Sequence, residues 1–153
     1  MINMSEGDNI QQIRCEGNRL TTKILVVDDA PLVCAVITRL LAHAQYEVQA
    51  VHSGSAALDL LMHEVPDLIL LDITMPAPDG LEVCRQLKQN PRTAIIPIVL
   101  LTGLDDVESS AQAARAGADD LLIKPFDQRQ LLACVQSVLL KFTALSDRAV
   151  NDF

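Results

Sequence analysis

The fold is decided by the stretch Asp67-Leu68-Ile69-Leu70-Leu71-Asp72, in which four aliphatic residues lie between two carboxylates. Such a short apolar run predicts a strand that is buried on both faces of a sheet. Two prolines and a glycine follow within residues 73–80, so the strand cannot continue past Asp72. Ligands of open α/β sheets bind at the carboxyl ends of strands, which makes Asp72 the first candidate site residue.

Three further apolar runs also end in a reactive group. Residues 23–27 precede Asp28 and Asp29, residues 95–101 precede Thr102, and residues 121–123 precede Lys124. A fifth run, residues 46–51, alternates polar and apolar residues, which is typical of a strand at a sheet edge. Five strands are therefore predicted, and four of them end in a group that can bind or react.

Helical patterns separate the strands. The helix that Pro31 opens is predicted to bury a wide face made of two apolar ridges, formed by Leu32, Val36 and Leu40 and by Val33, Ile37 and Leu41. The predicted N-caps of the later helices are Ser53, Asp79, either Asp105 or Asp106, and Asp127. This βαβαβαβαβα order predicts a parallel sheet with helices on both faces.

Length and composition indicate one domain in a chain of 153 residues. Residues 1–21 are predicted to be a disordered extension, residues 22–142 the folded domain, and residues 143–153 a frayed tail. The formal net charge of −8 argues against direct binding of nucleic acid. No apolar run is long enough to span a membrane and no signal peptide is evident, so a cytoplasmic location is expected.

The four cysteines lack metal-ligand spacing. Cys34, Cys84 and Cys134 lie in helical apolar patterns, so we expect them to be small buried hydrophobic residues.

The groups at the strand ends point to phosphoryl chemistry. In a parallel sheet, Asp28, Asp29 and Asp72 would crowd one edge and repel one another unless a cation is present. Mg²⁺ suits such a site, because a few carboxylates, waters and a phosphoryl oxygen complete its octahedron. Asp72 could then attack phosphorus and form an aspartyl phosphate, while Lys124 and Thr102 stabilise the phosphoryl oxygens.

Four motifs carry a resemblance to a known family. They are Val27-Asp28-Asp29, the Asp72-x-x-Met75-Pro76-x-x-Asp79-Gly80 segment, Leu101-Thr102-Gly103, and Gly117-Ala118-Asp119-Asp120 followed by Lys124-Pro125-Phe126. Over about residues 23–141, the chain resembles the CheY-like receiver domain of bacterial two-component response regulators. The resemblance implies a flavodoxin-like (βα)5 three-layer sandwich with strand order 2-1-3-4-5.

The resemblance also implies roles for the site residues. Asp72 would accept a phosphoryl group from a sensor histidine kinase or a phosphotransfer protein. Asp29, Asp72 and the Thr74 backbone carbonyl would bind Mg²⁺ directly, and Asp28 would help through water. A cis peptide bond between Lys124 and Pro125 is implied as well.

The sequence departs from the family at a position involved in switching, and also at Pro78 and Gly103. In similar receivers the hydroxyl at the Thr102 position moves toward the phosphoryl group, and an aromatic ring three residues before the lysine swings inward. Leu121 occupies that position here, so a ring-flip readout is not expected. Leu104 and Thr74 would flank the path of a hydrolytic water, and an apolar Leu104 would slow loss of the phosphate.

Three functions stay open from the sequence. The first is a signalling receiver whose phosphorylation changes a partner-binding surface, with no enzymatic activity beyond its own phosphorylation and dephosphorylation. The second is a pseudo-receiver scaffold that binds partners without phosphorylation. The third is an aspartyl-phosphate phosphatase of the haloacid-dehalogenase kind, which would want a second Asp where Thr74 stands.

The output of a receiver is not evident from the sequence. About ten residues follow the last predicted helix, too few for a DNA-binding or cyclase domain. We therefore expect either a separate downstream protein partner or an effector domain in a longer chain. Whether phosphorylation drives formation of a homodimer stays open.

Overall fold

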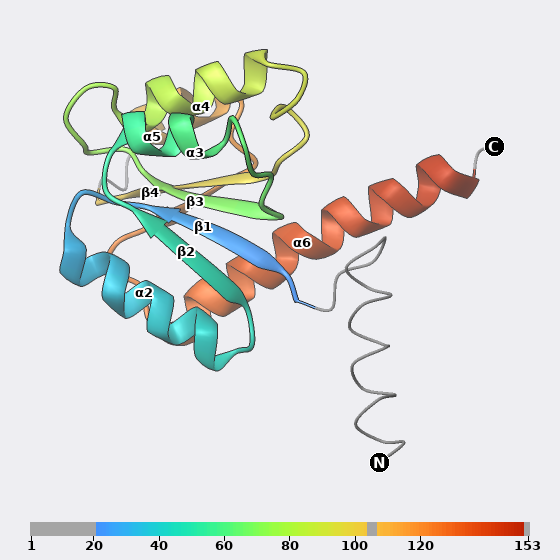
Figure 1. Ribbon diagram of the computed structural model, residues 1–153, viewed down its shortest axis with the longest axis horizontal. Helices are drawn as coiled ribbons and strands as arrows, with labels where there is room; N and C mark the ends of the chain where they lie inside the picture. Colours follow the sequence, from blue (N-terminus) through green and yellow to red (C-terminus); the bar gives the residue numbers. More distant parts are fainter. Residues whose placement is uncertain (1–20, 104–106, 152–153) are drawn as a thin grey trace.

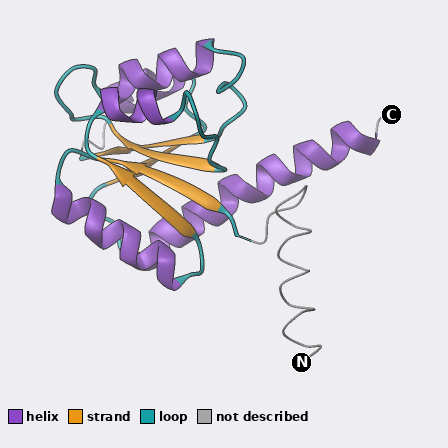
Figure 2. Ribbon diagram, viewed as in Figure 1, coloured by secondary structure: helices purple, strands orange, loops and turns teal. Residues whose placement is uncertain are grey.

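The protein is a three-layer α/β sandwich in the computed structural model, which describes residues 21–103 and 107–151. A parallel sheet lies between two layers of helices (Figures 1 and 2). The elements, in chain order, are β1 (Lys23–Val27), α2 (Pro31–His43), β2 (Glu47–Val51), α3 (Gly54–Leu60), β3 (Leu68–Asp72), α4 (Gly80–Gln89), β4 (Ile98–Thr102), α5 (Val107–Ala116), β5 (Asp120–Ile123) and α6 (Gln128–Asn151).

The sheet has the order β2-β1-β3-β4-β5, and every neighbouring pair is parallel. This is the predicted flavodoxin-like topology. All residues of β3 and β4 are buried, as the continuous apolar runs predict. β2 lies at one edge and alternates exposed and half-buried residues over most of its length, as its sequence pattern predicts.

Each face of the sheet has its own hydrophobic core. One core lies under α3, α4 and α5, and the other lies under α2 and α6 (Figure 1). Alternate residues of each central strand enter opposite cores, so that Leu25 belongs to the first and Val26 to the second. The side chains packed in these two cores fix the positions of β1, β3, β4 and β5 relative to one another, and so fix the positions of their carboxyl ends.

The prediction of a wide buried face on α2 is wrong. Leu32 is 82% exposed and Val36 is 57% exposed, whereas Cys34, Ile37 and Leu41 are buried. A helix that lies on a sheet buries only one stripe, and the stripe through Cys34, Ile37 and Leu41 follows helical spacing. The two exposed residues lie away from that stripe and face solvent.

Three of the predicted helix caps are present. The Ser53 side chain accepts from the Ala56 backbone N–H, and Asp79 accepts from the Glu82 backbone N–H. Asp127 and Gln130 form a reciprocal capping box, with each side chain accepting from the backbone N–H of the other at 2.8 and 2.9 Å. The predicted cap at Asp105 or Asp106 lies outside the described residues.

The C-terminal boundary differs from the prediction. α6 continues to Asn151, whereas a frayed tail is predicted from residue 143. The segment 128–151 contains neither glycine nor proline and is rich in leucine, alanine and other good helix formers, which explains the longer helix. The predicted disordered extension, apart from Thr21, lies outside the described residues.

The cysteines follow the prediction only in part. Cys34 and Cys84 are buried, but Cys134 is half-buried, with its thiol directed at the Asp120 carboxylate. Burial, followed by the charge of Asp120, raises the pKa of the Cys134 thiol to about 12. Within the described part of the chain, no helix is long and apolar enough to cross a membrane.

Candidate functional site

Three carboxylates meet at the carboxyl ends of β1 and β3. These strands are neighbours, and Val27 pairs with Leu71, which brings the residues that follow them side by side. Asp28, Asp29 and Asp72 each offer an oxygen, and these three oxygens lie within 4.8 Å of one another. Asp28 and Asp72 are buried, whereas Asp29 is exposed at the rim. We call these three residues the acidic cluster.

Lys124 provides the positive charge of the site. Its Nζ lies 3.0 Å from Asp28 Oδ2 and 3.4 Å from Asp72 Oδ1. Burial disfavours the ammonium form, but the hydrogen bond to Asp28 and the charges of Asp72 and Asp28 outweigh it and raise the pKa of Lys124. The Lys124–Pro125 peptide bond is cis, as the resemblance implies.

Asp72 accepts hydrogen bonds from Thr74 in addition to its ion pair with Lys124. The Thr74 hydroxyl donates to both oxygens of Asp72, at 3.1 and 3.3 Å, and the Thr74 backbone N–H lies 3.3 Å from Oδ1. Two roles are expected of Thr74 from the sequence, a backbone carbonyl ligand of the cation and a position beside the path of a hydrolytic water, and neither includes this hydrogen bond to Asp72. The signal that could have found it is the hydroxyl of Thr74, which donates to the carboxylate two residues earlier in the chain.

Thr102 and Leu121 lie on β4 and β5, the two strands that follow β3 in the sheet order. Thr102 is the buried last residue of β4, and its backbone carbonyl accepts from the Lys124 backbone N–H at 2.7 Å. Leu121 pairs with Leu100 and packs against the core under α4 and α5. Thr102 is thus linked to Lys124 through the backbone, while Leu121 lies farther back along β5. Leu104 lies outside the described residues.

The loop after β3 is held against Asp72 by a close approach that the sequence pattern does not reveal. A Cβ added to Gly80 would lie 2.7 Å from Ile73 Cα and would overlap the Asp72 carbonyl oxygen. Only a glycine allows the start of α4 to pack this tightly on the segment that carries Asp72. The Ala77–Pro78 bond in this loop is also cis, which was not predicted.

The acidic cluster suits a hard divalent cation. All three donors are carboxylate oxygens, the ligand type that Mg²⁺ prefers, and no sulfur or imidazole donor joins them in the described set. With the single ammonium of Lys124, the four groups carry a net charge of about −2 when ionised. Asp28, Asp29 and Asp72 would hold the ion, and the deficit of positive charge would favour its binding.

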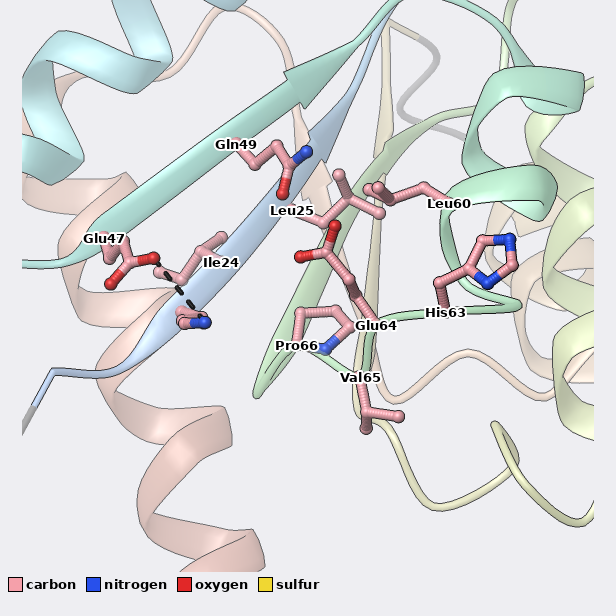
Figure 3. Close-up of a pocket in the computed structure, with 10 residues that line it drawn as sticks. Ile24, Leu25, Glu47, Gln49, Leu60, His63, Glu64, Val65 and Pro66 are labelled. Carbon is pink, nitrogen blue, oxygen red and sulfur yellow. Dashed lines mark ion pairs between the residues drawn. The ribbon is translucent and has the colours of Figure 1, made fainter. Parts of the chain in front are cut away.

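A pocket lies at the opposite end of the sheet from the acidic cluster. Figure 3 shows a pocket of about 280 Å³ beside the first residues of β1 and β2, where Lys23 and Glu47 form an ion pair at 3.7 Å. The Glu64 carboxylate extends over Leu25 toward Gln49 in the same view. Because this pocket adjoins the amino ends of the strands, it lies apart from the acidic cluster and is not the candidate site.

Comparison with known proteins agrees with this geometry. The chain is 39% identical over 117 residues to the DNA-binding dual master transcriptional regulator RpaA of Synechocystis sp., covering 76% of this chain and 48% of RpaA. It is 41% identical over 128 residues to the response regulator PleD of Caulobacter vibrioides, covering 84% of this chain and 28% of PleD. The chain thus spans less than half the length of these two relatives.

A solved structure and a family model agree with the similarity to these response regulators. The chemotaxis protein CheY4 of Vibrio cholerae superposes with a TM-score of 0.74 at 30% identity, covering 77% of this chain and 98% of CheY4. Residues 24–136 match the family described as the response regulator receiver domain. With the acidic cluster and Lys124 at the carboxyl edge of a 2-1-3-4-5 sheet, the chain belongs to the response regulator receiver domain family.

Proposed function

We propose that Asp72 accepts a phosphoryl group, in a Mg²⁺-dependent reaction, from a sensor histidine kinase or a phosphotransfer protein. Receiver domains have a phosphoacceptor role in two-component signalling, and this chain belongs to that family. The observation that carries the proposal is the clustering of Asp72 with two further carboxylates and with the ammonium of Lys124. An isolated carboxylate at a strand end would more often be a turn residue.

The residues around Asp72 support a direct transfer. An Asp72 oxygen would form a bond to phosphorus as the bond between phosphorus and the donor's histidine nitrogen breaks. Lys124, already 3.4 Å from Asp72 Oδ1, would bind a phosphoryl oxygen, and the Thr102 hydroxyl would donate to another. Mg²⁺, when bound by the acidic cluster, supplies charge neutralisation on the transferred group.

The raised pKa of Lys124 supports its assigned role. A lysine that stays an ammonium at neutral pH offers a fixed positive charge to the incoming phosphoryl group.

We propose that the chain catalyses only its own phosphorylation and dephosphorylation and has no other substrate.

The output would be a change in a partner-binding surface. Movement of Thr102 toward the phosphoryl group would pull on the carboxyl end of β4 and so on the segment leading to α5, biasing the surface formed by α5, β5 and α6. Leu121 has no ring to swing, so we propose that Thr102 alone starts this change. The recipient would be a downstream protein, or an effector domain of a longer chain.

A pseudo-receiver scaffold is the second candidate. Leu121 favours it, because this residue departs from the aromatic switch position of similar receivers. The intact acidic cluster and Lys124 favour phosphorylation instead.

Incubation with acetyl phosphate and Mg²⁺, followed by intact-mass measurement, tests the proposal. We expect a gain of one phosphoryl group in the wild type, and no gain in Asp72→Asn or in the presence of a chelator. Asp120→Asn, which alters an exposed carboxylate at the start of β5, is the matched control and should be phosphorylated like the wild type. If neither acetyl phosphate nor a phosphorylated histidine protein modifies the wild type, the scaffold function replaces this proposal.

A further inference from the structure

The backbone carbonyl of Asp28 accepts two side-chain hydrogen bonds from different elements. The Cys34 thiol, on the first turn of α2, lies 3.2 Å from this oxygen. His52 Nδ1, directly after β2, also lies 3.2 Å from it. Because a carbonyl can only accept, the proton of His52 must be on Nδ1 for this bond to form. The Asp28 backbone N–H is held as well, by the Val51 carbonyl at 3.2 Å.

This carbonyl belongs to the peptide group that joins Asp28 to Asp29. The orientation of a planar peptide fixes the direction in which the next residue leaves the strand. Two donors on one oxygen therefore fix the direction in which Asp29 leaves β1. A free strand end would let this peptide rotate, and Asp29 would then move relative to Asp28 and Asp72.

Asp29 depends on this support more than its neighbours do. The Asp28 carboxylate accepts from the Ala30 backbone N–H at 2.9 Å and pairs with Lys124, and the Asp72 carboxylate is held by Thr74 and Lys124. Among the residues that the structure describes, Asp29 has no side-chain hydrogen bond or ion pair. Its position within the acidic cluster therefore comes from its backbone.

We infer that Cys34 and His52 are positioning residues that hold Asp29 in place as a ligand of the divalent cation. The inference rests on the proposed function, because it concerns the Mg²⁺ that the acidic cluster would bind. It extends the support of the site to a buried thiol of α2 and an exposed imidazole after β2. Groups that hydrogen-bond a metal ligand directly typically change metal affinity by about 10- to 100-fold when removed, and each of these two groups, which act through the backbone, should have a smaller effect.

The test is the Mg²⁺ dissociation constant, measured by titration calorimetry on the unphosphorylated chain. His52→Ala and Cys34→Ala should each raise it by several-fold, and the double variant by about tenfold. His52→Asn should restore most of the affinity, because its amide N–H takes the place of Nδ1–H. Thermal unfolding without Mg²⁺ is measured alongside, so that loss of affinity is separated from loss of fold.

Two matched controls are available in the same chain. Cys84 is also a buried thiol that donates to a backbone carbonyl, that of Ala116 at 3.4 Å, but it lies in the opposite helical layer. His63 is also an exposed histidine, beside the pocket of Figure 3 at the far end of the sheet. Cys84→Ala and His63→Ala should leave the Mg²⁺ dissociation constant unchanged.

The outcomes separate this inference from the proposed function. Unchanged affinity in the His52→Ala, Cys34→Ala double variant, with a wild type that binds Mg²⁺, overturns the inference alone. If the two control variants lose Mg²⁺ affinity as well, the effect of Cys34 and His52 is a general one on stability, and this result also overturns the inference. A wild type that does not bind Mg²⁺ overturns both the inference and the Mg²⁺-dependent function.

Discussion

Lys124→Met is expected to lower the free energy of unfolding by about 2 kcal/mol at pH 7 without Mg²⁺. The substitution keeps much of the side-chain volume but removes the ammonium from between Asp28 and Asp72, which are 1% and 2% exposed. Two buried carboxylates would then repel each other without compensation. We place the loss below that of a fully buried ion pair because the Lys124 side chain is 27% exposed.

The same variant should lose most of its phosphorylation. Removal of one preorganised charge from a developing phosphoryl oxyanion typically costs about 100-fold or more in rate. Urea unfolding followed by circular dichroism gives the stability, and the time course of intact mass with acetyl phosphate gives the rate. Mg²⁺ should recover more stability in Lys124→Met than in the wild type, because the cation replaces the missing positive charge.

Lys88→Met is the matched control. Lys88 is also a half-buried lysine in an ion pair, 3.0 Å from Asp119, and it donates to the carbonyls of Ala94 and Ile96. Its loss should lower stability while leaving the phosphorylation rate per folded molecule unchanged. A Lys124→Met variant that is phosphorylated at the wild-type rate would contradict the role assigned to Lys124.

The pH dependence of the Lys124 contribution has a definite sign. The pKa of Lys124 is raised in the folded protein above its ordinary value of 10.5. The stability that this ammonium contributes is therefore fully present below about pH 10.5 and is lost as the pH rises through the folded value. The difference in unfolding free energy between wild type and Lys124→Met should shrink above that pH, since other alkaline titrations are shared by both proteins.

The sheet and the acidic cluster were predictable because they depend on strand patterns. Continuous apolar runs identified β1, β3 and β4, and parallel order placed Asp28, Asp29, Asp72 and Lys124 at one edge. Local capping rules likewise found Ser53, Asp79 and Asp127. Each of these inferences needs only the residues of one segment and the direction of the strands.

Features that depend on contacts between segments were not predictable. The exposure of Leu32 and Val36 follows from how α2 lies on the sheet, which the helical pattern alone does not determine. The hydrogen bonds of Cys34 and His52 to Asp28 join residues from three parts of the chain. Neither side chain stands out in the sequence, because the spacing of both matches no metal or catalytic motif.

Gly80→Ala is expected to lower the free energy of unfolding by about 2 kcal/mol, although helix propensity alone predicts the opposite. Gly80 is the first residue of α4, where alanine would gain up to about 1 kcal/mol over glycine. The added methyl would lie 2.8 Å from the Asp72 carbonyl carbon and 2.7 Å from Ile73 Cα. These are backbone atoms of the strand end, so either α4 or the segment after β3 must move.

That movement should also slow phosphorylation. Asp72 is held by Lys124 and Thr74 at distances of 3.1 to 3.4 Å, and a shift of its backbone would lengthen these bonds. We expect a slower gain of phosphate per folded molecule and weaker Mg²⁺ binding in Gly80→Ala. Unfolding curves and intact-mass time courses measured on the same preparation give both effects.

Gly103→Ala provides the matched control for this steric argument. Gly103 follows β4 at the same edge of the sheet, but a Cβ added there would meet no atom of the described residues within 4 Å. Alanine at this position should change stability by less than about 0.5 kcal/mol, because it adds no close contact. If Gly80→Ala were as stable and as quickly phosphorylated as Gly103→Ala, the packing of α4 on the Asp72 backbone would not be what holds Asp72 in place.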